Sequence, residues 1–334
     1  MKQELVPHIA ITIGDINGIG PEIILKVLKE VNLSNSTPVI IAPVDVLRFY
    51  ASELSMNFEF HTAETPADIR KNEVNVIPLD IPSLKINPGK QSGESGKVAM
   101  LSIEKGIDLV KEGACHALIT APISKEAVNL AGYNIPGHTE FLASKTHTAD
   151  VLMMLVSGNL RVALATTHIP IHKVANAITK SLIKDKIEIL RKSLKGDFDI
   201  STPKIAVFGL NPHAGDGGVI GEEEIEIISP VLDEIRKKGM EVDGPFPADG
   251  FFGQKLHEKY DAILAMYHDQ GLAPFKLLSF GKGVNFTAGL PIIRTSPDHG
   301  TAFNIAGKGM ADSSSFKQAY NLALQLVKQR NREA

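Results

Sequence analysis

Short apolar runs alternate with longer amphipathic segments along most of this 334-residue chain. The apolar runs are rich in Val and Ile and carry few polar residues, which is typical of strands that are buried on both faces. They predict strands that begin near His8, Pro38, Asn75, His116, Val151, Leu160, Lys204, Ala262 and Gly283. Strands separated by helices indicate α/β layers around a largely parallel sheet.

The amphipathic segments predict helices. One begins at Pro21, a favourable first helical residue, and places Ile24, Val27, Leu28 and Val31 on one face. Further helices are expected at about Val98–Lys111, Ser181–Leu194, Glu222–Lys238 and Ser315–Arg330. Polar residues interrupt the apolar stretch Val151–Ala165, which therefore predicts two strands joined by a turn.

Composition narrows the class of protein. Hydrophobic residues make up 43% and charged residues 22% of the chain, which is typical of a globular protein, and the length favours two domains. The net charge of −3 argues against a nucleic-acid partner. Cys115 is the one cysteine, so we expect a buried thiol in a reducing compartment and no intrachain disulfide. Without a signal peptide or a run of about 18 apolar residues, we expect a cytoplasmic protein with no membrane partner.

Three histidines share a position relative to a predicted strand. His168, His213 and His268 each come just after an apolar run. Because the carboxyl ends of parallel strands face the ligand crevice of an α/β sheet, three imidazoles at these positions can converge on one metal ion. Neutral imidazole suits zinc, cobalt, nickel or iron, and three ligands leave coordination positions open for a substrate.

The same histidines have a simpler interpretation. A histidine after a strand is often only a loop or capping residue, and sequence separations do not show that the three meet. Asp249 and Asp269 can orient such ligands or carry protons, but each is equally typical of a turn.

Three glycine-rich segments are candidates for an anion site, a mobile lid or a functional loop. The loop from Gly14 to Glu22 joins a strand to a helix, which is the arrangement of an anion site, but its glycine spacing is not that of a dinucleotide fingerprint. Gly215–Gly221 is either a mobile lid or a turn. Gly283–Gly309 is long, polar and rich in glycine, as functional loops often are.

Several basic residues can hold an oxyanion. Lys125, Lys276 and Arg294 are candidates, although isolated Lys and Arg residues are usually only surface charges. Arg294 is preferred because the guanidinium group can make two parallel bonds to an oxyanion. His138 and Thr139 offer an imidazole and a hydroxyl at an expected helix start, where Thr139 can also act as a simple cap.

Eight segments, taken together and in order, resemble the PdxA family of 4-hydroxythreonine-4-phosphate dehydrogenases. They are ITIGDINGIGPE, TAPISKEA, PGHTEFLA, TTHIP, NPHAGDGG with GEEE, PADGFF, YHDQGLAPFK and GVNFTAGLPIIRTSPDHGTAFNIAGKG. They extend from Ile11 to Gly309, so the resemblance covers nearly the whole chain.

The resemblance implies a set of site residues. A divalent metal such as Zn, Co or Mg would be held by His168, His213 and His268. The substrate would contact His138, Thr139, Lys276, Asn285 and Arg294. For the base that removes the hydroxyl proton, Lys125, Asp249 and Asp269 are the candidates, and the sequence does not single one out. The family is a homodimer whose active site lies at the subunit interface and takes metal ligands from both chains.

The resemblance also implies a fold and a cofactor. We expect the two-domain α/β/α fold of the isocitrate/isopropylmalate dehydrogenase type, with an interdomain cleft. One domain would comprise residues 1–127 plus 290–334, and the other residues 128–289. The segment DHGTAFNIAGKG, with His299 and Asn304, resembles the adenosine-binding loop of those enzymes, which implies NAD as the cofactor.

The chain departs from the family pattern at several positions. Ile16-Asn17 replace Pro-Ala, Ser124 replaces Asn, Gly250 replaces Thr or Ser, and Asn304 replaces Asp. An amide at position 304 would repel the 2′-phosphate of NADP less than a carboxylate does, so we expect weaker discrimination against NADP.

The resemblance implies oxidation of 4-phosphohydroxy-L-threonine to a 3-oxo acid, which decarboxylates to 3-amino-2-oxopropyl phosphate in pyridoxal 5′-phosphate biosynthesis. The alternatives are a dehydrogenase of D-threonate or D-erythronate 4-phosphate, a metal-dependent phosphohydrolase and a non-catalytic metabolite sensor.

Overall fold

The computed structural model describes residues 5–135 and 137–333, and it divides into two compact units. Unit 1 comprises Met1–Thr148 and Leu290–Asn331, and unit 2 comprises Ala149–Gly289 and Arg332–Ala334. Two parts of the sequence patterns discussed above, the first four residues of the chain and Pro136 of the PGHTEFLA motif, lie outside the described residues.

The first boundary of unit 1 lies about twenty residues beyond the predicted position at 127. Helices α4 (Lys125–Leu130) and α5 (His138–Lys145) remain with unit 1 because they contact helix α3 (Gly93–Lys111). Gly96 of α3 packs so tightly against α4 that an added Cβ would lie 2.0 Å from the carbonyl oxygen of Ala127. Lys145 of α5 forms an ion pair of 2.8 Å with Glu104 of α3.

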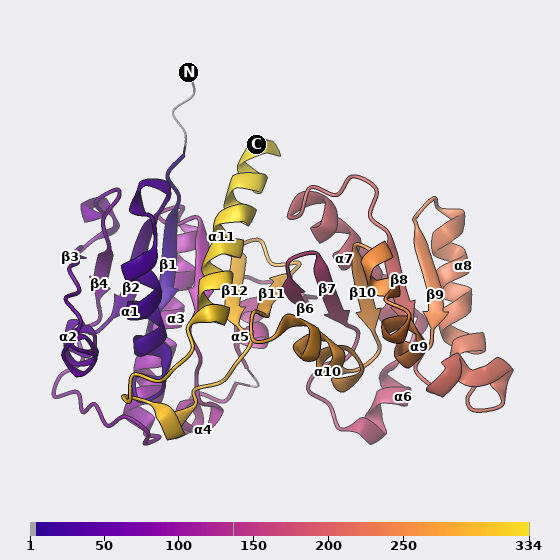
Figure 1. The fold of residues 1–334 in the computed structure, drawn as a ribbon, viewed down its shortest axis with the longest axis horizontal. Helices are drawn as coiled ribbons and strands as arrows, with labels where there is room; N and C mark the ends of the chain where they lie inside the picture. The colour runs from indigo at the N-terminus through magenta and orange to yellow at the C-terminus, as the bar shows by residue number, and fades with distance from the viewer. Residues whose placement is uncertain (1–4, 136, 334) are drawn as a thin grey trace. The chain divides into compact units, whose positions relative to one another are not determined.

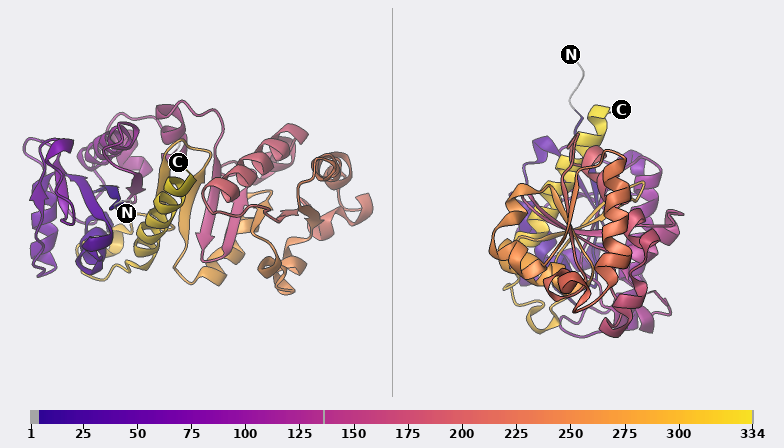
Figure 2. Two further views of the ribbon diagram at one scale, coloured as in Figure 1. Left: turned by 90° about the horizontal axis from the view of Figure 1, so that it is seen from above. Right: turned by 90° about the vertical axis from the view of Figure 1, so that its right-hand side faces the viewer.

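Unit 1 is a parallel sheet covered by helices on both faces (Figures 1 and 2). Its strand order is β3 (His61–Thr62), β4 (Asn75–Pro78), β2 (Thr37–Ala42), β1 (His8–Thr12), β5 (Ala117–Thr120) and β12 (Ile293–Pro297). All of its recorded strand pairs are parallel. Helix α3 covers one face, and α1 (Gly20–Glu30) and α11 (Ser314–Glu333) cover the other. Helix α2 (Val44–Glu53) packs against α1.

Unit 2 has a mixed sheet with the strand order β11 (Val284–Ala288), β6 (Leu152–Ser157), β7 (Leu160–Leu164), β10 (Ala262–Ala265), β8 (Ile205–Phe208) and β9 (Val242–Phe246). Strand β6 is antiparallel to β7 and β11, whereas β7, β10, β8 and β9 run parallel. The helices of this unit are α6 (Val174–Ala177), α7 (Lys180–Gly196), α8 (Ser229–Lys237), α9 (Ala248–Gly253) and α10 (His268–Ser279). A π-helical segment, Glu224–Ile228, precedes α8.

The predicted α/β class is confirmed, and each of the nine predicted strands is present. The hairpin predicted within residues 151–165 is the pair β6–β7. Strands β3, β9 and β12 were not predicted. β12 carries the buried charge of Arg294, and β9 contains Gly244 and Pro245, so neither has the apolar pattern of a central strand. Gly283–Gly309 is therefore not a single loop, because it contains β11 and β12.

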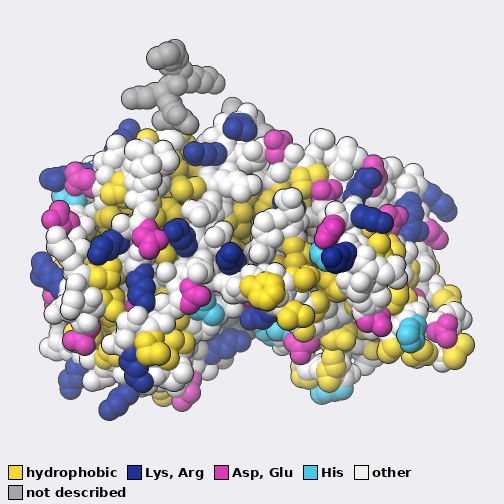
Figure 3. Space-filling view, in the orientation of Figure 1, with side chains coloured by type: hydrophobic (Ala, Val, Ile, Leu, Met, Phe, Trp, Pro, Cys, Tyr) yellow, Lys and Arg dark blue, Asp and Glu magenta, His cyan; other side chains and the backbone are white. Residues whose placement is uncertain are grey.

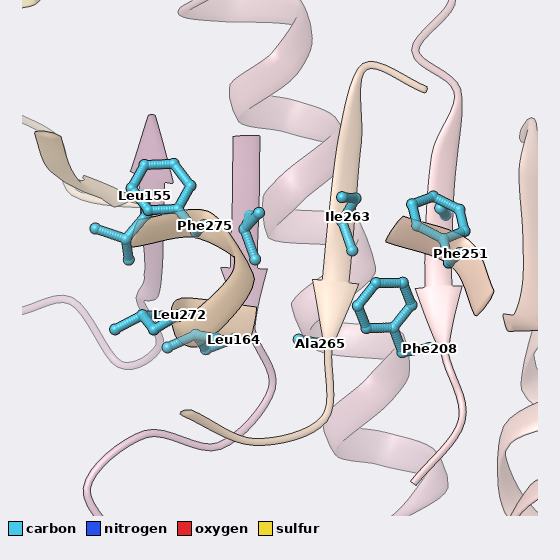
Figure 4. Close-up of a cluster of buried hydrophobic side chains, with 10 residues drawn as sticks. Leu155, Leu164, Phe208, Phe251, Ile263, Ala265, Leu272 and Phe275 are labelled. Atoms are coloured by element: carbon cyan, nitrogen blue, oxygen red, sulfur yellow. The ribbon is translucent and has the colours of Figure 1, made fainter. Parts of the chain in front are cut away.

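A buried cluster of aromatic and aliphatic side chains packs helices of unit 2 against its strands (Figure 4). Helix α10 contributes Leu272 and Phe275, and the strands beneath it contribute residues such as Leu164 and Ala265. Phe208 of β8 meets Phe251 of α9 in an edge-to-face contact with ring centroids 5.1 Å apart. Well-packed aromatic pairs of this kind hold neighbouring strands and helices in fixed positions.

The surface is consistent with the small net charge. Lys, Arg, Asp and Glu side chains are interspersed on the face that Figure 3 shows. Within the described part of the chain, no helix combines the length and the apolar character needed to cross a membrane. Cys115 is buried, and burial raises the pKa of its thiol to about 12, so it is protonated at neutral pH.

Candidate functional site

The three strand-end histidines follow three neighbouring parallel strands of unit 2. His168 follows β7, His268 follows β10, and His213 follows β8, with β10 lying between the other two strands. The parallel direction of these strands places all three carboxyl ends at the same edge of the sheet. The fold therefore places all three histidines after strands that end at one edge of the sheet, but within the described residues it does not bring the three imidazoles together on one ion.

His168 and His268 lie close together. Their ring centroids are 6.0 Å apart, and both residues line a pocket of about 310 Å³ together with Thr167, Tyr267, Asp269 and apolar residues. The strand ends that carry them are joined by hydrogen bonds, since both the amide and the hydroxyl of Thr166 donate to the carbonyl of Met266. This pairing of β7 with β10 holds the backbones that lead to the two histidines side by side.

Asp269 bonds to the ring of its neighbour. Its carboxylate oxygen Oδ1 lies 2.7 Å from Nδ1 of His268. When Nδ1 carries the proton and donates to the carboxylate, Nε2 keeps its lone pair for a metal ion. The sequence allowed Asp269 either to orient a metal ligand or to carry protons. This contact favours orientation of the His268 imidazole.

The donors fit a divalent metal in chemistry and in spacing. Metal–nitrogen distances of about 2.0 to 2.1 Å place two imidazole centroids bound to one tetrahedral ion about 5 Å apart, close to the observed separation. Among residues 5–135 and 137–333, however, no three His, Cys, Asp or Glu side chains of one chain form a group able to hold a metal. The chain by itself therefore brings two of the three predicted ligands together.

His213 stands apart from this pair on a distorted turn. The turn follows β8 and spans Pro212–Gly218, and His213 itself has a φ of 53° in the left-handed region. Its side chain is exposed to solvent.

The other predicted residues of unit 2 lie on different elements. Asp249 is exposed in the first turn of α9 and does not line the pocket of His168 and His268. Lys276 is exposed on α10, eight positions along the chain from His268. Asn285 lies on β11, and its Oδ1 is buried without a hydrogen-bond donor. A buried amide oxygen without a donor is a suitable acceptor for a ligand N–H or O–H group.

Unit 1 contains a buried cation beside an uncharged imidazole. Arg294 on β12 is 2% exposed, and its Nε and one terminal nitrogen donate to Thr120 Oγ1 at 3.1 and 2.7 Å. Burial lowers the pKa of Arg294 to about 10 against the opposing effect of Glu140, so the guanidinium remains charged at neutral pH. Burial and the positive charge of Arg294 hold the pKa of His138 well below its ordinary value of 6.5.

This arrangement suits an oxyanion. His138 is neutral at pH 7, and its Nε2 is buried without a hydrogen-bond partner. A buried guanidinium group attracts carboxylate and phosphate, and a neutral imidazole can donate one further hydrogen bond. Thr139 follows His138 in the first turn of α5. Lys125 begins α4, and its Cε lies 3.9 Å from the position that a Cβ on Gly137 would occupy.

Sequence reasoning missed two residues of this group. Thr120, the last residue of β5, accepts both bonds from Arg294, and Glu140 lies close enough to raise the pKa of that guanidinium. The signal for Thr120 was its place at a strand end, the same feature that identified the histidines. Glu140 sits two residues after His138 in the predicted helix start, where it resembles an ordinary first-turn acid.

The segment that contains His299 and Asn304 is anchored to helix α1. Lys26 Nζ donates to the carbonyls of Gly309 and Ala311 at 2.9 and 2.8 Å and to Glu22 at 2.8 Å. Glu22 is fully buried and also accepts from the amide of Ala311. His299 Nε2 is buried without a partner, so it can bond to a ligand.

The glycine loop before α1 has a structural role. The amides of Asn17, Gly18 and Ile19 donate to protein oxygens, the last of them to Thr301. A Cβ on Gly18 would lie 2.9 Å from the carbonyl oxygen of Thr301. Because these donors are engaged, the loop packs against the Thr301 segment and does not offer those amides to an anion.

Two departures from the family pattern have clear local roles. Ser124 caps α4 by accepting a bond from the amide of Ala127, a task that Asn performs equally well. The side chain of Asn17 donates to the carbonyl of Lys90 and accepts from the amide of Asn87, which joins the glycine loop to a neighbouring turn.

Known proteins resemble this chain along nearly its whole length. A sequence model of the family described as pyridoxal phosphate biosynthetic protein PdxA matches residues 34–323. The 4-hydroxythreonine-4-phosphate dehydrogenase of Prosthecochloris aestuarii is 46% identical over 326 residues, which cover 95% of this chain and 96% of that protein. The protein of the same name from Bacteroides thetaiotaomicron is 44% identical over 328 residues, with coverages of 98% and 90%.

The comparison of structures agrees. The crystal structure of 4-hydroxythreonine-4-phosphate dehydrogenase from Klebsiella pneumoniae superposes with a TM-score of 0.87 at 40% identity, covering 98% of this chain and 99% of that chain. Fold and sequence therefore point to the same group of proteins.

Proposed function

The chain belongs to the PdxA family of pyridoxal phosphate biosynthetic proteins, and on that premise we propose that it is a 4-hydroxythreonine-4-phosphate dehydrogenase. The proposed reaction is the NAD-dependent oxidation of 4-phosphohydroxy-L-threonine. The structural observation that supports the proposal is the buried Arg294 beside the neutral His138, because a guanidinium group and an imidazole N–H are suitable partners for an oxyanion of the substrate.

The substrate carries a carboxylate and a phosphate, and both need cationic or N–H partners. We assign Arg294, His138 and Thr139 of unit 1, and Lys276 and Asn285 of unit 2, to these groups. The fixed bonds of Arg294 to Thr120 hold the guanidinium plane in place, so little conformational freedom remains to be lost on binding.

We assign His168, His213 and His268 as ligands of a divalent metal, with zinc, cobalt or magnesium as the candidates. When bound, such an ion supplies Lewis acidity that lowers the pKa of a substrate hydroxyl. Asp269 keeps His268 in the tautomer that presents Nε2. Tyr267 and Ile169 line the same pocket as His168 and His268.

A base must remove the hydroxyl proton. Lys125 and Asp249 remain the candidates, because Asp269 is engaged with His268. NAD, when bound, would accept the hydride from the carbinol carbon, and the base would take the hydroxyl proton. The resulting 3-oxo acid loses carbon dioxide, and a proton takes the place of the carboxylate on that carbon, which gives 3-amino-2-oxopropyl phosphate.

We propose that NAD lies against the segment that holds His299 and Asn304. The buried, unpartnered Nε2 of His299 supports this assignment, as does the anchoring of the segment by Lys26. The exposed Asn304 carries no charge to repel a 2′-phosphate, so NADP is expected as an alternative cofactor.

We further propose a homodimer whose active site takes ligands from both chains. A single chain places only two of the three predicted histidines together in the part of the chain that the structure describes. Apolar side chains that a second copy can cover are exposed at the end of α10, where Leu277 and Phe280 are 70% and 81% exposed.

The deciding experiment measures NADH fluorescence with purified protein, a divalent metal, NAD and either 4-phosphohydroxy-L-threonine or D-threonate 4-phosphate. NADH formation with the amino acid, abolished by chelation, is the expected result. NADH formation with the sugar acid alone would replace the substrate assignment. Release of phosphate without NADH would show a phosphohydrolase instead, and binding without turnover would show a sensor.

A further inference from the structure

The turn that carries His213 is built from consecutive left-handed residues. The φ angles are 53° at His213, 51° at Ala214, 82° at Gly215, 45° at Asp216 and 66° at Gly217. A left-handed conformation is unfavourable for an L-residue, and it normally occurs as a single residue. Three of these five residues are not glycine, so other contacts must hold the turn in this shape.

A buried carboxylate supplies those contacts. Glu224 is 2% exposed, and its Oε1 accepts from the amides of Leu210 and Asn211 at 2.7 and 2.8 Å. Its Oε2 accepts from the side-chain amide of Asn211 at 2.9 Å. Both donor residues lie immediately before the turn, so Glu224 fixes the direction in which the chain enters it.

Glycines let the backbone close around this carboxylate. A Cβ on Gly215, inside the turn, would lie 2.6 Å from Oε2 of Glu224, and one on Gly209 would lie 2.9 Å from Oε1. The backbone in the turn and just before it therefore packs closely against both oxygens of the Glu224 carboxylate. Glu224 begins the π-helical segment Glu224–Ile228, a form of helix that is rare and often found near functional sites.

The entry to the turn is also tied to the strand that precedes His268. Gln270 Nε2 donates to the carbonyl of Gly209, and its Oε1 accepts from the amide of Met266, both at 2.7 Å. Gly209 follows β8 and Met266 follows β10. The chain that leads to His213 is thus fixed at the edge of the sheet as well as by Glu224.

We propose that Glu224 is a positioning residue for metal binding, which sets the left-handed turn so that His213 presents its imidazole in one direction. Glu224 does not act as a ligand, because it is buried and three protein N–H groups occupy its two oxygens. The proposal rests on the proposed function, in which His213 ligates the metal.

The test is calorimetric titration of the metal-free protein with Zn²⁺ and with Co²⁺. Glu224→Gln replaces one carboxylate oxygen with an amide that faces the donor Asn211 Nδ2, so the turn loses one of its bonds. The dissociation constant for both ions is expected to rise at least tenfold, as it does when partners that orient metal ligands are removed. Glu226→Gln is the matched control, because Glu226 belongs to the same segment but is exposed, and its metal affinity should be unchanged.

The outcomes separate this proposal from the function on which it rests. If the wild-type protein binds no metal, the proposed metal site fails and this inference fails with it. If the wild type binds metal and folded Glu224→Gln binds it equally well, the function survives and the positioning role is wrong. A lower unfolding temperature of the metal-free variant, with unchanged metal affinity, would also overturn the proposal.

A second variant covers the case in which Glu224→Gln does not fold. Asn211→Ala removes one side-chain donor and leaves both backbone bonds to Glu224, so the buried carboxylate keeps most of its partners. The same direction of change in metal affinity is expected, with a smaller size. Wild-type affinity in folded Asn211→Ala would contradict the proposal.

Discussion

At the scale of single residues, the site combines charged and neutral groups whose protonation depends on burial. His138 is the clearest case, because burial and the charge of Arg294 both favour its neutral form. A neutral His138 does not compete with Arg294 for counter-charge and can still donate a hydrogen bond to an oxyanion. Its depressed pKa has a consequence for stability that can be measured without substrate.

Stability should fall as the pH drops below 6.5, and His138→Gln should reduce that fall. Below the unfolded pKa of histidine, the unfolded chain binds a proton at this position that the folded chain does not bind, so acid favours unfolding. The contribution is at most about 1.4 kcal/mol per pH unit. Denaturant unfolding at pH 7.5 and 5.5 measures it, and equal losses in wild type and variant would contradict a neutral His138.

Asn304 permits a prediction about cofactor choice. In the proposed arrangement residue 304 faces the ribose of the cofactor, so Asn304→Asp would set a carboxylate against the 2′-phosphate of NADP, and the preference for NAD over NADP should rise by about tenfold. The ratio of kcat/KM for the two cofactors checks this. A wild-type preference already as strong as that of Asp-bearing relatives would show that residue 304 does not face the ribose.

At the scale of elements, helix α1 anchors the end of the segment that we propose holds the cofactor. Lys26 joins the buried Glu22 to the carbonyls of Gly309 and Ala311. Lys26→Met leaves a buried carboxylate without its cation, which typically costs about 3 kcal/mol or more. We therefore expect a lower free energy of unfolding together with a raised KM for NAD.

The double variant Glu22→Met with Lys26→Met separates charge from packing. Replacing both members of a buried ion pair with apolar residues often restores stability. The double variant should therefore be more stable than Lys26→Met, while its KM for NAD stays high because the bonds to residues 309 and 311 are still missing. A wild-type KM in the double variant would show that the anchor does not position the cofactor segment.

Part of the fold and of the candidate site could be predicted from the sequence. Alternating apolar runs and helices predicted the α/β class. The position of His168, His213 and His268 just after predicted strands selected them as candidate ligands, and the structure shows that the three strands are parallel neighbours. β12 escaped prediction because a buried arginine interrupts its apolar pattern. Local periodicity reveals which segments are buried, but it carries no information about which charge a strand delivers to a site.

Residues whose hydrogen-bond partners lie far away in the sequence were also not predicted to have a role. Glu224 bonds to residues 13 and 14 positions away, Gln270 to one 61 positions away, and Lys26 to one 285 positions away. Each side chain is ordinary for a helix or a turn when read in sequence. Only the fold brings its partners within hydrogen-bond distance, so such positioning roles can be recognised only in the three-dimensional structure.

At the scale of the whole molecule, the question is how three histidines serve one metal ion. His168 and His268 are paired within a chain, whereas His213 stands on a separate turn. We therefore expect His168 and His268 of one chain to share a site with His213 of its partner in the proposed homodimer. This arrangement predicts that two inactive variants can restore activity when they assemble together.

The experiment joins a His168→Ala chain with a His213→Ala chain, each carrying a different affinity tag, and purifies the dimer that holds both tags. Each homodimer lacks a ligand in both sites and should be inactive. In the mixed dimer one site lacks two ligands and the other keeps all three, so about half of the wild-type activity is expected. The mixed dimer of His168→Ala and His268→Ala is the matched control, because each of its sites lacks one ligand. Activity in the control but not in the first pair would show that His168 and His213 serve the same site from one chain.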